Sequence, residues 1–220
     1  KDARFDFVSM LQSRISPKTK AIYFNSPNNP TGVSLTRGQL EDLAQFAEKY
    51  NLWIIADNAY ENYDYTLQGY LDIAQLDTAI DRTFAIYTFS KTYAMPGYRV
   101  GYVIAPELMA DQIRKISLYS IYSVSTASQF GALQALNVET SILAKYHLWA
   151  MQARDIVVNE LHIPYTYPQG GLYTLLNLSE WAIGDTNDFI RQCIENGVSL
   201  APGIAFGNEL RPGDTGWLTG

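Results

Sequence analysis

Charged and polar side chains follow three apolar segments of this sequence, at the points where strands of a sheet would end. The three groups run from Asn25 to Gly32, from Asp57 to Tyr60, and from Thr88 to Arg99. Ligands of α/β sheets bind at the carboxyl ends of the strands, so these groups are the candidates for chemistry. Together they offer one carboxylate, one amine, one guanidinium, hydroxyl groups and side-chain amides.

These groups suit proton transfer, covalent catalysis and anion binding. An amine with the ordinary lysine pKa of about 10.4 is protonated at neutral pH, so Lys91 needs a perturbed environment to act as nucleophile or base. The planar guanidinium of Arg99 suits phosphate or carboxylate. Taken singly, an aspartate after a strand is most often a turn former, and a lone lysine or arginine is a solvated surface group. Only the combination therefore indicates a site.

Alternating apolar and helical segments would position these side chains. Short apolar segments predict strands at 21–24, 52–56, 84–88 and 100–104. The spacing of Thr36 and Gln39 predicts a capping box, and apolar residues at helical spacing then predict a helix to about Tyr50. Four strands separated by crossovers predict an α/β fold: a mostly parallel sheet flanked by helices.

Two further helical segments follow the fourth strand. Pro106 is expected at the first position of one helix. Helical periodicity then runs from Thr126 to about Leu161, which is longer than one ordinary helix, so we expect a break near Val138 to Ser141.

The pattern of strand and helix segments in the sequence changes after Pro164. A turn from Pro168 to Gly171 precedes a strand at 172–178, a helix at 188–195 and a short strand at 198–201. This β-α-β segment predicts the start of a smaller α/β domain. We therefore expect one domain over residues 1–162 and a second over 163–220.

Composition narrows the class of protein. Lys and Arg total 16 against 22 Asp and Glu, a net charge of −6, which disfavours a nucleic-acid binder. The single Cys193 forms no internal disulfide, and His147 and His162 make a poor metal set, so we expect no metal site. The apolar segments are too short to cross a bilayer, and no signal peptide is visible. We expect an acidic cytoplasmic protein that binds neither nucleic acid nor membrane.

Four motifs in this order resemble the pyridoxal-phosphate-dependent aminotransferases of class I and II, which have the fold-type I architecture. The motifs are NSPNNPTG from Asn25, DNAY from Asp57, TFSK from Thr88, and Arg99 eight positions after Lys91. The order and spacing of all four are specific, whereas any one alone would be weak. The resemblance runs from about Ala21 to Gly216.

The resemblance implies pyridoxal 5′-phosphate as cofactor and a role for each matching residue. Lys91 would form the Schiff base and then move the substrate α-proton, and Asp57 would pair with the pyridine nitrogen and keep it protonated. Tyr60 and Asn29 would hydrogen-bond the ring hydroxyl, and Ala59 would pack flat on the ring. The residues implied as phosphate ligands are Arg99, Thr88 and, as a weaker candidate, Ser90.

The resemblance also implies an amino acid and a 2-oxo acid as substrates and a homodimer in the full-length enzyme. Residues 1–162 would then be part of the large cofactor-binding domain and 163–220 part of the small C-terminal domain. Thr219 stands where the family has an arginine for the substrate carboxylate, and Arg211 lies in a Pro/Gly loop. Segments that the family has before Lys1 and after Gly220 are also missing, so we expect an incomplete chain that binds cofactor weakly by itself.

Two other functions remain open at this point. Another fold-type I enzyme, such as a carbon-sulfur lyase, would carry the same motifs. A ligand-sensing domain of a transcription regulator would also resemble an aminotransferase without being an enzyme. Assayed products would separate the lyase, and a basic winged-helix segment upstream would indicate the regulator.

Overall fold

The computed structural model describes residues 7–160, 165–178, 185–206 and 217–219. The chain forms two compact units. The first comprises residues 1–26, 35–61 and 70–140, and the second comprises residues 27–34, 62–69 and 141–220. The division at residue 162 into a large and a small domain stays a prediction.

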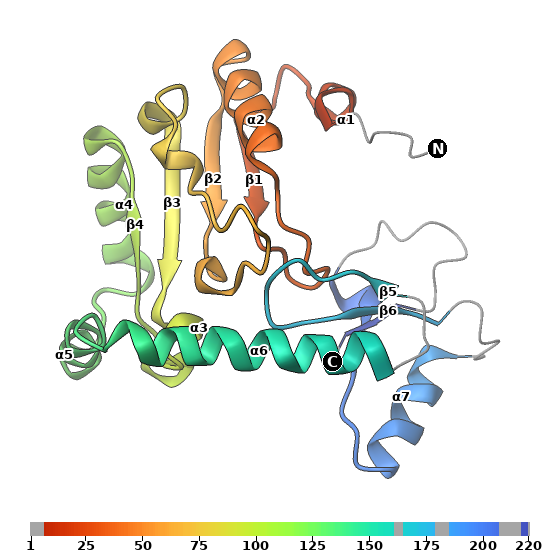
Figure 1. Cartoon of the computed structure of the whole chain (residues 1–220). Coiled ribbons are helices and arrows are strands. Elements are labelled where there is room, and N and C mark those ends of the chain that lie inside the picture. The colour runs from red at the N-terminus through yellow and green to blue at the C-terminus, as the bar shows by residue number, and fades with distance from the viewer. Residues whose placement is uncertain (1–6, 161–164, 179–184, 207–216, 220) are drawn as a thin grey trace. The chain divides into compact units, whose positions relative to one another are not determined.

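The first unit contains a four-stranded sheet in the order β1-β2-β3-β4 (Figure 1). The strands are β1 (Ala21–Asn25), β2 (Trp53–Asp57), β3 (Thr83–Thr88) and β4 (Gly101–Ile104). β1, β2 and β3 are parallel, and β4 is antiparallel to β3. The prediction of an α/β fold with a mostly parallel sheet is confirmed. β4 reverses because residues 89–100 contain only short helical turns, and a parallel return needs a longer crossover.

Helix α2 (Arg37–Lys49) covers one face of β1 and β2 and forms the main core. The Thr36 side chain accepts the backbone N–H of Gln39, and the Gln39 side chain accepts the backbone N–H of Thr36, so the predicted capping box is confirmed. The apolar stripe of the helix packs against Leu52, Ile54 and Ala56. Its buried members are Leu40, Leu43, Ala44, Phe46 and Ala47.

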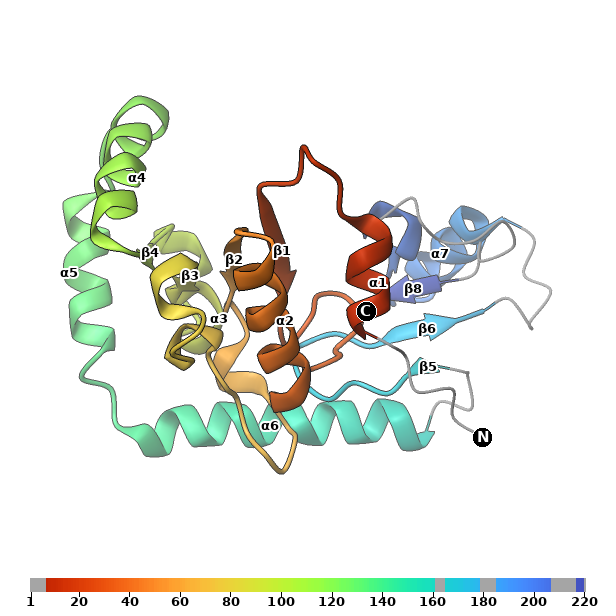
Figure 2. The same cartoon turned by 90° about the horizontal axis from the view of Figure 1, so that it is seen from above.

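The helices after β4 follow the expected order with one correction. α4 (Glu107–Ser120) begins one residue later than predicted, because Pro106 has extended backbone (ψ 142°) and is the N-cap rather than the first helical residue. Figure 2 shows α4 beside β4, on the side of the sheet away from α2. The predicted break near 138–141 is confirmed, since α5 (Thr126–Ala135) ends before α6 (Thr140–Glu160) begins.

The second unit contains a sheet in the order β5-β6-β8-β7, with every described pair antiparallel. Its strands are β5 (Tyr165–Thr166), β6 (Leu175–Asn177), β7 (Ala201–Pro202) and β8 (Trp217–Thr219). The strand predicted at 172–178 is shorter than expected, since β6 has three residues. The strand predicted at 198–201 is displaced, since β7 shares only Ala201 with that range. The predicted helix is α7 (Thr186–Glu195), whose N-cap is Asp185.

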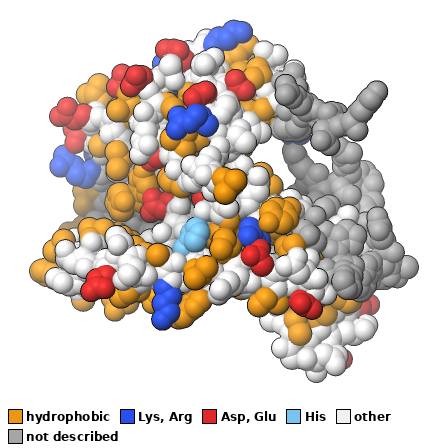
Figure 3. Space-filling model, viewed as in Figure 1, with side chains coloured by type: hydrophobic (Ala, Val, Ile, Leu, Met, Phe, Trp, Pro, Cys, Tyr) orange, Lys and Arg blue, Asp and Glu red, His pale blue; other side chains and the backbone are white. Residues whose placement is uncertain are grey.

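The remaining elements are short. α1 (Phe7–Arg14) packs against the main core, and α3 (Phe89–Thr92) directly follows β3. The 3₁₀ helices are Glu61–Tyr63, Ile73–Gln75, Ile80–Arg82, Pro96–Tyr98 and Gly203–Phe206. Hydrophobic side chains are spread over the face seen in Figure 3, and several of those on α4 are exposed, including Leu108 and Ile116. Among the described helices we find none with the length and apolar character needed to span a membrane.

Candidate active site

Asp57 ends β2 on the face of the sheet opposite α2. Ile54 and Ala56 are fully buried toward α2, so the alternation of the strand turns Asp57 to the other face. Its Oδ1 accepts the backbone N–H of Ala59 at 3.1 Å, and its Oδ2 accepts the Tyr23 hydroxyl at 3.0 Å. The carboxylate is therefore fixed in one orientation by donors from β1 and from the loop after β2.

Two β1 residues that the sequence analysis did not single out as site residues hold Asp57. Tyr23 is one, and Asn25 is the other, since its Nδ2 donates to the Asp57 carbonyl oxygen at 2.8 Å. Burial raises the pKa of the Tyr23 hydroxyl, and the charge of Asp57 and their hydrogen bond raise it further. Tyr23 therefore stays a neutral donor near neutral pH. The available signal was spacing, since Tyr23 and Asn25 alternate onto the Asp57 face of adjacent strands.

Lys91 lies in α3, just after the carboxyl end of β3. Thr88 is the N-cap of this short helix, because its Oγ1 accepts the backbone N–H of Ser90 at 3.1 Å. The same oxygen contacts the Ser90 hydroxyl at 2.9 Å. Lys91 Nζ lies 5.6 Å from the centroid of the Tyr60 ring, and Tyr60 is only 4% exposed. The parallel strands β2 and β3 thus bring the amine to the residues that follow Asp57.

Arg99 reaches the same region from the segment that leads into β4. The backbone N–H of Phe89 donates to the Val100 carbonyl at 3.1 Å, which places Arg99 beside the beginning of α3. Arg99 has left-handed backbone (φ 54°), and so has Ala94 (φ 52°). This conformation costs non-glycine residues roughly 1–2 kcal/mol each. The exposed guanidinium donates through Nη1 to the Pro96 carbonyl at 2.8 Å.

An acidic cluster lies next to these residues in the first unit. Burial raises the pKa of Glu61 to about 7, and the negative charge of Asp72 adds to the shift. The Tyr87 hydroxyl donates to Asp72 Oδ2, and burial raises the pKa of Tyr87. Glu61 is not among the predicted site residues, because nothing in its local sequence shows that Asp72 will lie beside it.

The first unit therefore holds seven of the eight predicted site residues. They are Asp57, Ala59, Tyr60, Thr88, Ser90, Lys91 and Arg99. Asn29 belongs to the second unit, in the loop from Pro27 to Ser34. Arg211 lies outside the described residues. Among the described residues, we find no group of three or more His, Cys, Asp or Glu side chains that could hold a metal ion.

Residues 1–218 match the family model described as aminotransferase class I and II. This chain belongs to that family. Aminotransferases of class I and II use pyridoxal 5′-phosphate. The predicted resemblance is therefore confirmed.

Individual aminotransferases are similar to this chain over most of its length. An aromatic-amino-acid aminotransferase 2 from Thermococcus litoralis is 33% identical over 205 residues, which cover 91% of this chain and 53% of the relative. An aspartate aminotransferase from Thermotoga maritima is 36% identical over 200 residues, covering 89% of this chain and 50% of the relative. The chain thus spans about half the length of the curated relatives it matches.

A solved structure gives the same result for the fold. The crystal structure of an aromatic aminotransferase from Pyrococcus horikoshii superimposes with a TM-score of 0.86 at 30% sequence identity. The match covers 96% of this chain and 57% of that chain. The α/β architecture of the first unit is therefore that of an aminotransferase.

The donor set of the first unit fits pyridoxal 5′-phosphate. The cofactor carries an aldehyde, a ring nitrogen, a ring hydroxyl and a phosphate. Lys91 would offer an amine to the aldehyde, Asp57 a carboxylate to the ring nitrogen, and Tyr60 a phenol to the ring hydroxyl. Arg99 and Thr88 offer a guanidinium and a hydroxyl, the donors that phosphate prefers. Each polar group of the cofactor thus has a chemical complement among the described residues.

Proposed function

We propose that this chain carries the cofactor-binding residues of an aminotransferase that moves an amino group between an amino acid and a 2-oxo acid. The observation that carries the proposal is the placement of Lys91 Nζ beside Tyr60, with the oriented Asp57 carboxylate three residues before that tyrosine. The family match supports it. The relatives are named as aminotransferases, so no observation favours a lyase or a transcription regulator.

Pyridoxal 5′-phosphate, when bound, supplies an electron sink for the bond that breaks at the substrate α-carbon. Lys91 would hold the cofactor as a Schiff base through Nζ, and the same atom would then carry the α-proton. Asp57, held by Tyr23 and Ala59, would keep a proton on the ring nitrogen. The fixed donors on both carboxylate oxygens support this pairing, since a carboxylate without them would rotate away from the ring.

The other residues would bind and orient. Tyr60 would donate to the ring hydroxyl from one side, and Asn29 is proposed as the second partner of that hydroxyl. Ala59 would leave room for the flat ring because its side chain is a single methyl group. The phosphate would be held by Arg99, Thr88 and Ser90. Arg99 would bind it through its planar, charged guanidinium, and the two hydroxyl groups would donate hydrogen bonds to it.

Covalent labelling of the lysine tests this proposal. Purified chain is mixed with pyridoxal phosphate, its absorbance spectrum is recorded, and borohydride then fixes any Schiff base for mass mapping. We expect the label on Lys91, and we expect Lys91→Ala to abolish both the absorbance and the label. Lys115→Ala, an exposed lysine of α4, serves as the control and should leave both unchanged. A label on Lys115 or Lys145 in the parent chain would refute the assignment.

The substrate class has its own test. The relatives are named for aspartate or aromatic amino acids, so we propose an amino acid of one of these kinds. α-Proton exchange with D₂O should be measured for aspartate, tyrosine and phenylalanine, with lysine as a comparison. Exchange with lysine alone would contradict this proposal.

The assembly and cellular location complete the proposal. We propose a homodimer for the full-length protein, a cytoplasmic location, and a division at residue 162 into parts of a large and a small domain. Sedimentation of the full-length protein as a monomer at micromolar concentration would contradict the homodimer.

A further inference from the structure

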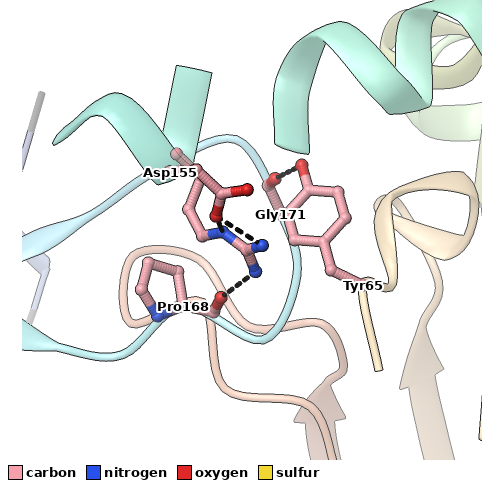
Figure 4. Close-up of polar contacts among 5 residues, drawn as sticks. Tyr65, Asp155, Pro168 and Gly171 are labelled. Carbon is pink, nitrogen blue, oxygen red and sulfur yellow. Dashed lines mark hydrogen bonds and ion pairs between the residues drawn. The ribbon is translucent and has the colours of Figure 1, made fainter. Parts of the chain in front are cut away.

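Arg154 of α6 is a nearly buried arginine to which the proposed chemistry gives no role. Its side chain is 11% exposed. Nε and Nη2 each lie 2.7 Å from Asp155 Oδ1, and Nη1 donates to the Pro168 carbonyl at 3.0 Å (Figure 4). A charge removed from water is destabilising unless it is paired and hydrogen-bonded. Here the three contacts fix the guanidinium in one orientation.

Two tyrosine rings enclose the same guanidinium. Its central carbon lies 4.9 Å from the centroid of the Tyr65 ring and 5.3 Å from that of Tyr167. The Tyr65 hydroxyl donates to the Gly171 carbonyl at 2.6 Å, and burial raises its pKa, so it remains a donor (Figure 4). Arg154 therefore holds the first residue of the turn 168–171, and the tyrosine packed on it holds the last.

The turn 168–171 is hydrogen-bonded to the loop from Pro27 to Ser34. The backbone N–H groups of Gln169 and Gly170 both donate to the Gly32 carbonyl, at 2.7 and 2.9 Å. A Cβ atom on Gly32 would lie 2.5 Å from Pro168 Cβ, and Gly32 has φ +69°, so the contact requires glycine. The Ser34 N–H donates to Gln169 Oε1 at 3.3 Å.

Hydrogen bonds within the loop connect Gly32 to the backbone next to Asn29. The Gly32 N–H donates to the Asn28 carbonyl at 2.8 Å, and the Asn28 N–H donates to the Val33 carbonyl at 2.9 Å. The Thr31 hydroxyl donates to Asn28 Oδ1 at 2.7 Å. Asn28, the residue before Asn29, is therefore held by hydrogen bonds to Gly32, Val33 and Thr31, which close the loop around Asn29.

We infer that Arg154 is a positioning residue: through the turn 168–171 it sets the conformation of the loop that presents Asn29. The contacts that carry this inference lie within the second unit. The inference rests on the proposed function only for what Asn29 does to the cofactor. The coupling between Arg154 and the loop is independent of that function.

Amide hydrogen exchange of the chain without cofactor tests the coupling. Arg154→Ala should raise exchange in residues 27–34 and 166–171 roughly ten- to hundredfold, as expected for losing hydrogen bonds to a charged group. Residues 37–49 of α2 should exchange as in the parent. Arg191→Ala is the matched control, because Arg191 also pairs with an aspartate in the second unit, at 3.0 Å, but is 69% exposed. Unchanged exchange at 27–34 in Arg154→Ala would overturn the inference.

A milder variant tests the same coupling if Arg154→Ala unfolds the whole chain. Tyr65→Phe keeps the ring on the guanidinium and removes only the hydrogen bond to Gly171. It should raise exchange at 166–171 and at 27–34 by several-fold while α2 stays protected. Tyr65→Phe that exchanges like the parent at 27–34 would also overturn the inference.

Absorbance of the chain with pyridoxal phosphate tests the consequence at Asn29. Asn29→Ala should shift the band of the Lys91 Schiff base, Arg154→Ala should shift it in the same direction, and the double variant should add nothing. A parent-like band in Arg154→Ala beside a shifted band in Asn29→Ala would refute the positioning role. An unshifted band in Asn29→Ala would instead refute the proposed role of Asn29, and the exchange result would still decide the coupling.

Discussion

Glu61 should make the stability of this chain depend on pH in a way that one substitution removes. Its pKa rises from an ordinary value of 4.5 to about 7, because burial and the charge of Asp72 both disfavour the ionised form. Between these values the unfolded chain releases a proton that the folded chain keeps. The free energy of unfolding therefore falls as pH rises from about 4.5 to about 7, and this contribution stays lost at higher pH.

The size of the effect follows from the shift. A pKa shift of one unit corresponds to about 1.4 kcal/mol, so the full shift would give an upper limit of about 3.4 kcal/mol. Glu61 is only partly buried, and solvent screening reduces that limit. We therefore expect Glu61→Gln to raise the free energy of unfolding by about 1–2 kcal/mol at pH 8 and by nearly nothing at pH 4.

Urea unfolding of the parent and the variant at both pH values measures this difference. Titrating groups that do not interact with Glu61 contribute equally to both proteins, so the difference reports Glu61 together with its interaction with Asp72. Glu48→Gln on α2, where the side chain is exposed, is the control and should change the free energy of unfolding by less than about 0.5 kcal/mol at either pH. A Glu61→Gln variant with the same stability difference at pH 4 and pH 8 would refute the reasoning.

Three further substitutions test the site and the core. In the full-length enzyme, Asp57→Asn should leave the Lys91 label in place but slow α-proton exchange roughly 100- to 1000-fold, because the ring nitrogen loses its ionic partner; near-parental exchange would contradict this. Leu43→Ala should lower the free energy of unfolding by about 2–5 kcal/mol in urea, because Leu43 is 1% exposed in the main core. Gly32→Ala should cost about 2–4 kcal/mol, combining a left-handed backbone with the 2.5 Å overlap at Pro168, and a neutral result would show that the loop shifts easily.

The elements that the sequence predicts well are those whose signals are local. β1, β2, β3 and α2 follow from short apolar segments, helical spacing and a capping box, all within a few residues. The direction of β4 was harder, because it depends on the length of the preceding connection rather than on the strand itself. The strands of the second unit are shorter than their apolar runs, since pairing with β8 decides where they begin and end.

The same distinction applies to the candidate site. Lys91 and Asp57 could be selected because they follow recognisable strands. Tyr23 was indicated only by its alternation with Asn25 on the strand beside Asp57. Glu61 could not be selected, because its role depends on Asp72, which the fold brings to it from elsewhere in the chain. Arg154 was missed for the same reason, since its contact with Pro168 is fixed only once α6 and the turn 168–171 have folded.

The left-handed backbone at Arg99 brings the stability of the chain and the proposed binding of phosphate into conflict at one residue. Glycine would adopt φ 54° without steric cost, so Arg99→Gly would remove strain from the segment that leads into β4. The same change would remove the guanidinium proposed to hold phosphate. Selection for thermal stability at this position therefore favours glycine, whereas selection for tight cofactor binding favours arginine. Glycine at residue 99 would therefore stabilise the chain but weaken the proposed binding of phosphate. Ala94 also has left-handed backbone (φ 52°) and no proposed ligand role, so Ala94→Gly would relieve the same kind of strain without that loss.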